Sequence, residues 1–199
     1  VVLPWRKLQL LWSRAALEGG DISGPVHHAL PMPDPMMVII ACVWWIAGFK
    51  RLARGLRLQK RLGLRPGELL GLQALDVLLP EDLESSVYTH GILNLGARTG
   101  TKLKRAQAVL LAPNSFELTL ARQLRDRLEP AALIFGAANY GFYNGLLSKT
   151  CPELEILPYR AHSPRVGHAT DSWLQGEDFV KIRERLRHMN DRRLRVYLD

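Results

Sequence analysis

The longest apolar run in the chain extends over residues 35–49 and contains no charged side chain. Asp34 and Pro35 are typical of a helix N-cap and first turn, so the run is predicted to be helical. A bilayer crossing needs about 20 apolar residues, and this run has about 15. It is therefore interpreted as a core helix of a folded domain.

A basic helix is predicted to follow directly on that run. Arg54, Arg57 and Arg61 fall at helical spacing on one face, with leucines between them. Two interpretations stay open for this face: a solvated surface, or a stripe that contacts DNA phosphates. Gly63 is expected to interrupt the helix, and Pro66 to begin another that reaches Leu72.

A change of pattern near residue 87 indicates a β-hairpin. Apolar residues 91–96 and 106–111 flank a polar stretch, residues 97–105, that is rich in glycine, threonine and lysine. The hairpin is thus predicted to carry a basic loop. Ser115 is then expected to cap a helix from Phe116 to Leu128.

The chain from about Tyr140 onward is expected to be mostly helical. Four residues are expected to break these helices: Pro152, Pro158, Pro164 and Gly176. Residues 177–195 are dense in arginine. Together these patterns predict a mostly α fold with a small antiparallel β-sheet (α+β) around a basic cleft.

The first 29 residues differ from the rest. They hold one amphipathic stretch, Trp5 to Leu17, followed by several glycines, and a proline cluster begins just after them. Residues 1–29 are interpreted as the remnant of an N-terminal helical segment and linker, and residues 30–199 as the main domain.

Charge narrows the range of partners. The net charge is +8 and the calculated pI is about 9.9, which favours a polyanionic partner such as nucleic acid or an acidic membrane surface. The two cysteines form neither a disulfide framework nor a zinc-ligand spacing. No secretory signal is recognised, so an intracellular location is expected.

Several common catalytic motifs are absent from the sequence. Residues 96–102 resemble a phosphate-binding loop, but the spacing is one residue short and no strand-loop-helix pattern follows. There is no HExxH, no GxSxG and no carboxylate cluster suited to a two-metal nuclease. No metal and no small-molecule cofactor are therefore expected.

What remains is a series of basic residues that ends in a tyrosine. Arg65 lies in LRPGELLGL, and His162 and Arg165 form HSPR, which is followed by GHATDSWLQG. This order and spacing resembles the active-site signature of the tyrosine recombinases (phage-integrase type) over about residues 30–199. The resemblance implies the catalytic set Arg65, Lys102, His162, Arg165, His188 and Tyr197.

The chemistry of these residue types fits cleavage of a phosphodiester. Two guanidiniums, Arg65 and Arg165, can hold the non-bridging oxygens, and cationic neighbours favour the phenolate of Tyr197. Lys102 is preferred over Lys104 as the lysine that protonates the leaving 5′-oxygen. The expected partner is double-stranded DNA bound by a homotetramer, with no membrane; the expected backbone contacts are Arg54, Arg57, Arg61, Lys104, Arg105 and Arg193.

Some features depart from the family pattern. Pro164 stands where leucine is more common, and Arg187 where glycine commonly precedes the second histidine. The sequence ends soon after Tyr197, and the N-terminal clamp domain is expected to be missing or reduced to residues 1–29. Two alternatives to a recombinase stay open: a DNA-binding relic of a mobile element that no longer recombines, and a type IB topoisomerase-like enzyme.

Overall fold

The computed structural model describes residues 29–83, 88–96 and 107–187. Helices dominate the described part, with two 3₁₀ turns and one small sheet. The helices are α2 (Asp34–Ile46), α3 (Lys50–Leu62), α4 (Pro66–Leu70), α5 (Phe116–Arg125), α6 (Tyr140–Glu153), α7 (Ser163–Leu174) and α8 (Phe179–Arg185). The turns are η1 (Ala74–Asp76) and η2 (Pro80–Asp82), and the strands are β1 (Val77–Leu78), β2 (Gly91–Asn94) and β3 (Ala108–Leu111).

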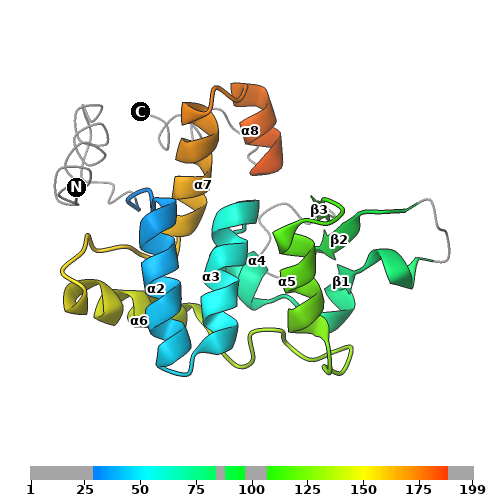
Figure 1. The fold of residues 1–199 in the computed structure, drawn as a ribbon, viewed down its shortest axis with the longest axis horizontal. Helices are drawn as coiled ribbons and strands as arrows, with labels where there is room; N and C mark the ends of the chain where they lie inside the picture. Colours follow the sequence, from blue (N-terminus) through cyan, green and yellow to red (C-terminus); the bar gives the residue numbers. More distant parts are fainter. Residues whose placement is uncertain (1–28, 84–87, 97–106, 188–199) are drawn as a thin grey trace.

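Helix α3 lies at the centre of the molecule. It contacts α2, α5 and α7, so three separate parts of the sequence are packed on one helix. In Figure 1 the sheet lies beyond α5 at one end of the molecule, and α7 and α8 lie together at its upper edge. This arrangement confirms the predicted fold class of mostly helices with one small antiparallel sheet.

The sheet has three antiparallel strands in the order β1-β2-β3. The predicted hairpin is present, with Ile92 paired to Leu110 and Asn94 to Ala108. Strand β1, which pairs Val77 with Leu93, was not predicted. Its two residues are too few to show the alternation of apolar and polar positions by which a strand is recognised.

Helix α2 is a core helix on one face only. Met36, Ile40 and Trp44 are buried, whereas Trp45 is 41% exposed and Ile46 is 86% exposed. The buried face packs against α3 and α6, and the other face has no such neighbour among the described helices. No helix in the described ranges has the length and apolarity that a membrane crossing requires.

Two of the expected proline breaks lie inside helices. Pro152 falls in the last turn of α6, and Pro164 in the first turn of α7. Proline is tolerated in a first turn because the N–H that it lacks has no partner there. Gly176 does follow the end of α7, with a φ of +79° that favours glycine.

Buried polar contacts lead from α2 and α6 to the start of α7. Trp44 Nε1 donates to Thr150 Oγ1 at 2.9 Å, and the Tyr143 hydroxyl donates to Gln59 Oε1 at 2.6 Å. Gln59 Nε2 in turn donates to the carbonyl of Ala161 at 2.8 Å. Because these groups are buried, removing one partner of a hydrogen bond leaves the other polar group buried without a partner, which is unfavourable. The network therefore fixes the residue that precedes His162.

Helix α7 also approaches the chain that leads into α2. The amide of Met32 donates to the Ser163 carbonyl at 3.1 Å. One turn along α7, a Cβ added to Gly167 would lie 2.1 Å from the Met32 carbonyl oxygen. Glycine at position 167 is thus required by the close approach of two backbones.

We expect Gly167→Ala to lower the free energy of unfolding by about 2 kcal/mol or more, because backbone has to move to admit the methyl group. Gly145→Ala is the matched control, since it also lies in a helix and has nothing within 4 Å of its added Cβ. That control is expected to gain up to about 1 kcal/mol from helix propensity. Urea unfolding of both variants measures the difference, and equal effects would contradict the packing argument.

Candidate active site

Arg65 is positioned by the turn between α3 and α4. Helix α3 is capped by Gly63, whose φ of +59° lies in the left-handed region, and Arg65 is the N-cap of α4. The Arg65 amide donates to Glu68 Oε2 at 2.8 Å, and its Nη1 donates to Glu68 Oε1 at 2.5 Å. The side chain is 34% exposed, so part of the guanidinium reaches solvent.

Arg165 is held by backbone carbonyls. It lies in α7 and is only 1% exposed. Its Nη1 donates to the Gly63 carbonyl at 2.5 Å, and its Nη2 donates to the Leu186 carbonyl. One guanidinium thereby joins the end of α3 to the end of α8, which orients it with little freedom to rotate.

The positive charges of both arginines act on His162. It is the N-cap residue of α7 and is half-buried. Burial lowers the pKa of His162, and the positive charges of Arg165 and Arg65 lower it further. Its ring lies 6.1 Å from the ring of Tyr140, measured between centroids. The structure thus brings Arg65 to His162 and Arg165, which are about a hundred positions away from it in sequence.

Six of the predicted site residues lie outside the described residues: Lys102, Lys104, Arg105, His188, Arg193 and Tyr197. Among the residues that are described, no group of three His, Cys, Asp or Glu side chains is arranged to hold a metal ion.

Glu68 and Arg187 complete the described part of the site. Arg187 Nη2 donates to Glu68 Oε2 at 2.6 Å, and both side chains are largely buried. Burial by itself raises the pKa of Glu68, but Arg187 and Arg65 outweigh it and hold the pKa below the ordinary value. Glu68 is therefore ionised at neutral pH. In the sequence, Glu68 lies within LRPGELLGL and Arg187 departs from the family pattern, but neither was given a role.

The fold is similar to those of two solved recombinases and one solved transposon integrase. The match to XerA recombinase has a TM-score of 0.62 at 16% identity and covers 98% of this chain and 68% of that one. The match to the Tn1549 transposon integrase in complex with a circular intermediate DNA has a TM-score of 0.64 at 16% identity, covering 98% and 73%. For XerH site-specific recombinase bound to difH substrate, the TM-score is 0.59 at 16% identity, covering 84% and 49%.

The chain has the fold of a tyrosine-recombinase catalytic domain. It spans about half the length of the XerH chain. No model of a known protein family matches the sequence. No curated protein matches it either. At this level of identity the likeness concerns the recombinase fold, so the roles of single residues are argued from their geometry.

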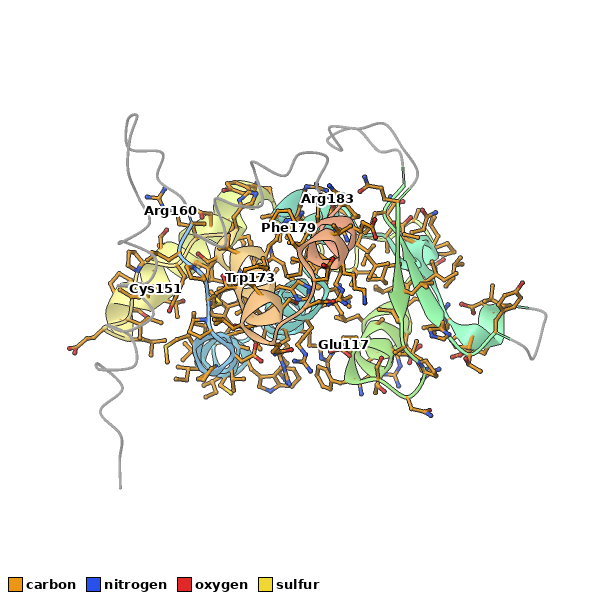
Figure 2. All side chains as sticks on the ribbon, turned by 90° about the horizontal axis from the view of Figure 1, so that it is seen from above. Glu117, Cys151, Arg160, Trp173, Phe179 and Arg183 are labelled. Atoms are coloured by element: carbon orange, nitrogen blue, oxygen red, sulfur yellow. The ribbon has the colours of Figure 1, made fainter. Side chains whose placement is uncertain are left out.

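The arginine stripe of this recombinase-like domain is engaged with neighbouring side chains. Arg54 lies over the Trp45 ring at 4.9 Å and Arg57 over the Phe116 ring at 4.3 Å, from guanidinium carbon to ring centroid. Arg61 Nε donates to Glu117 Oε1 at 3.0 Å. In the view of Figure 2, Glu117 lies on the lower side of the molecule, and Arg160 and Arg183 lie on the upper side. The ion pair between Arg61 and Glu117 therefore lies away from Arg160 and Arg183.

His168 is a neighbour of the site that sequence reasoning missed. Its Cδ2 would lie 2.8 Å from a Cβ at Gly63, and its buried Nε2 has no hydrogen-bond partner. Burial, and after it the charge of Arg185, lowers the pKa of His168 to about 3. The signal in the sequence was a histidine three residues after Arg165 on a helix, which is ambiguous without the packing.

We expect His168 to make the domain acid-sensitive. The unfolded chain binds a proton at His168 near pH 6.5 while the native state resists it down to about pH 3. Stability from this residue is therefore lost as pH falls, by up to about 1.4 kcal/mol per pH unit. His168→Phe should flatten the fall in unfolding free energy between pH 6.5 and 4.5, measured by urea unfolding.

The exposed His90 provides a matched control for that measurement. His90→Phe removes one histidine from the surface, so its pH dependence should follow the parent protein. If His168→Phe loses stability with falling pH as steeply as the parent does, the buried neutral imidazole is not the source of the acid sensitivity.

Proposed function

We propose that this chain cuts and rejoins DNA strands through a 3′-phosphotyrosyl intermediate, with Tyr197 as the nucleophile. The observation that carries the proposal is the assembly of Arg65, His162 and Arg165 at one place by the starts of two helices, α4 and α7. The likeness to solved recombinases and a transposon integrase with bound DNA supports the same conclusion.

In this mechanism the two arginines bind the scissile phosphate. Negative charge grows on the non-bridging oxygens as the tyrosine oxygen attacks, and preorganised guanidiniums stabilise that charge. Arg165 is preorganised by Gly63 and Leu186, and Arg65 by Glu68. Rigid donors of this kind need little rearrangement during the reaction, which is where their catalytic value lies.

The lowered pKa of His162 suits the role of a base. At neutral pH its imidazole is uncharged, so it can accept the proton from the Tyr197 hydroxyl. The phenolate oxygen then bonds to phosphorus as the bond from phosphorus to the 5′-oxygen breaks. Lys102 is the proposed donor of the proton that the 5′-oxygen takes up, with Lys104 as the second choice, and His188 adds a donor to the phosphate.

Rejoining repeats the same steps in reverse with a different 5′-hydroxyl, which regenerates the tyrosine. Double-stranded DNA is the proposed partner, in agreement with the net charge of +8. Exchange between two duplexes needs several active sites, so we propose a homotetramer on DNA. The proposed location is wherever the host DNA lies, in a nucleus or a nucleoid.

A nicked suicide DNA substrate tests the proposal. The nick lets the cleaved fragment diffuse away, so the covalent protein–DNA adduct is expected to accumulate and to be visible on a denaturing gel. The adduct should vanish in Tyr197→Phe, which lacks the attacking oxygen. Arg65→Gln should slow adduct formation on the order of 100-fold by removing one charged donor.

Each other outcome of that assay has a distinct meaning. Specific DNA binding without any adduct in the full chain would contradict the enzyme and favour a DNA-binding relic. Relaxation of supercoiled plasmid without strand exchange would favour a topoisomerase-like activity. An adduct that persists in Tyr197→Phe would show that a different residue is the nucleophile.

Salt dependence of binding tests the proposed backbone contacts. Each phosphate contact contributes about 0.9 to the slope of log affinity against log salt concentration. If Arg57 contacts a phosphate, Arg57→Gln should lower that slope by about 1. Arg61→Gln should change it less, because Glu117 already opposes the Arg61 charge. An unchanged slope in Arg57→Gln would show that the arginine face of α3 is a solvated surface that does not contact DNA phosphates.

A further inference from the structure

Arg187 is the residue that follows the C-cap of α8. Its φ is +56°, in the left-handed region that helix ends commonly adopt at this position, most often with glycine. Its side chain is nevertheless folded inward and only 9% exposed, with a buried Nε that has no hydrogen-bond partner. A buried charge persists only where its surroundings pair it. The contacts that hold Arg187 therefore indicate what it does.

Those contacts form a closed ring with Arg65. Arg65 Nη1 donates to Glu68 Oε1 at 2.5 Å, and Arg187 Nη2 donates to the other oxygen, Oε2, at 2.6 Å. The ring closes through the backbone, because Arg65 Nη2 donates to the Arg187 carbonyl at 2.9 Å. The Arg187 side chain also donates to the Arg185 carbonyl at 3.0 Å and to the Gly63 carbonyl at 3.4 Å, which keeps it folded inward.

We propose that Arg187 is a positioning residue for Arg65, which it orients through its carbonyl and whose charge it preserves by competing for Glu68. This proposal rests on the proposed function, since it assigns Arg65 to the scissile phosphate. Arg187 itself acts through Arg65 and Glu68, and no contact with DNA is assigned to it.

The charge balance at Glu68 explains the effect. With Arg187 in place, one carboxylate is shared by two guanidiniums, so the three side chains together carry a charge of about +1. Without the Arg187 guanidinium, both carboxylate oxygens become available to Arg65. A bidentate pair would then neutralise Arg65 and turn its guanidinium plane toward Glu68. Either change weakens the binding of a phosphate in the transition state.

The full chain with a suicide DNA substrate tests this inference. At saturating DNA, Arg187→Gly is expected to lower the single-turnover cleavage rate on the order of 100-fold, as a misplaced catalytic group does. DNA affinity should change less than about threefold, because one phosphate contact among many is affected. Arg187→Lys keeps the charge near Glu68 and should retain more of the rate. Millimolar guanidinium ion should partly restore Arg187→Gly, whereas sodium at equal concentration should not.

Arg127→Gly is the matched control. Arg127 also has a positive φ, of +65°, and is exposed beyond the end of α5. The control removes the same charge and relieves the same backbone strain, and it should cleave at the parent rate. Equal rates for Arg187→Gly and Arg127→Gly would overturn the proposal, as would a loss of rate with no rescue by guanidinium ion.

A second measurement separates this proposal from the proposed function. The Arg65 guanidinium N–H signals, assigned by their loss in Arg65→Lys, should be resolved by NMR in the parent protein because rotation is restricted. They should average in Arg187→Gly and stay resolved in Arg127→Gly. If the parent forms no adduct, the proposed function fails while the NMR result still decides whether Arg187 orients Arg65. Resolved Arg65 signals in Arg187→Gly would overturn the positioning role.

Discussion

The Arg165 guanidinium is the contact on which the rest of the site depends. It is almost fully buried and donates to the carbonyls of Gly63 and Leu186, so it ties α7 to the ends of α3 and α8. Burying such a charge is unfavourable unless its donors are satisfied. The ends of α3 and α8 must therefore both be in place before the buried Arg165 is stable. This requirement couples folding of the domain to assembly of the site.

The domain accommodates its positive charges with few carboxylates. Lys60 is 2% exposed and is paired with Asp171, with Asp34 at 3.5 Å. Glu68 serves two arginines at once. His168 remains neutral because of its burial and the nearby charges of Arg185, Lys60 and Arg165. A phosphate entering the site would thus meet the partly exposed Arg65 guanidinium already oriented by Glu68, and much of the cost of orienting it is met by folding.

The local patterns of the sequence predicted most of the helices. The apolar run after Asp34 and the glycine at position 63 gave helix limits close to those observed, because helix-ending signals are local. The predicted N-cap was wrong by one residue, since Pro33 is the N-cap and Asp34 is the first residue of α2. Strand β1 and the helical positions of Pro152 and Pro164 were not predicted correctly. Strand β1 depends on a partner strand that is distant in sequence, and the two prolines depend on their position within a helical turn. A short stretch of sequence contains neither kind of information.

The sequence by itself determined the order of the basic residues, the mostly helical fold class and the surplus of positive charge. It also singled out Arg65, His162 and Arg165, because their types and spacing resemble a known signature. Only the tertiary structure decided how they are held: by the Gly63 and Leu186 carbonyls, and by the Glu68 and Arg187 side chains. Every residue has a backbone carbonyl, so residue type does not reveal which carbonyls accept these hydrogen bonds. Contacts across more than a hundred positions arise only when the helices pack.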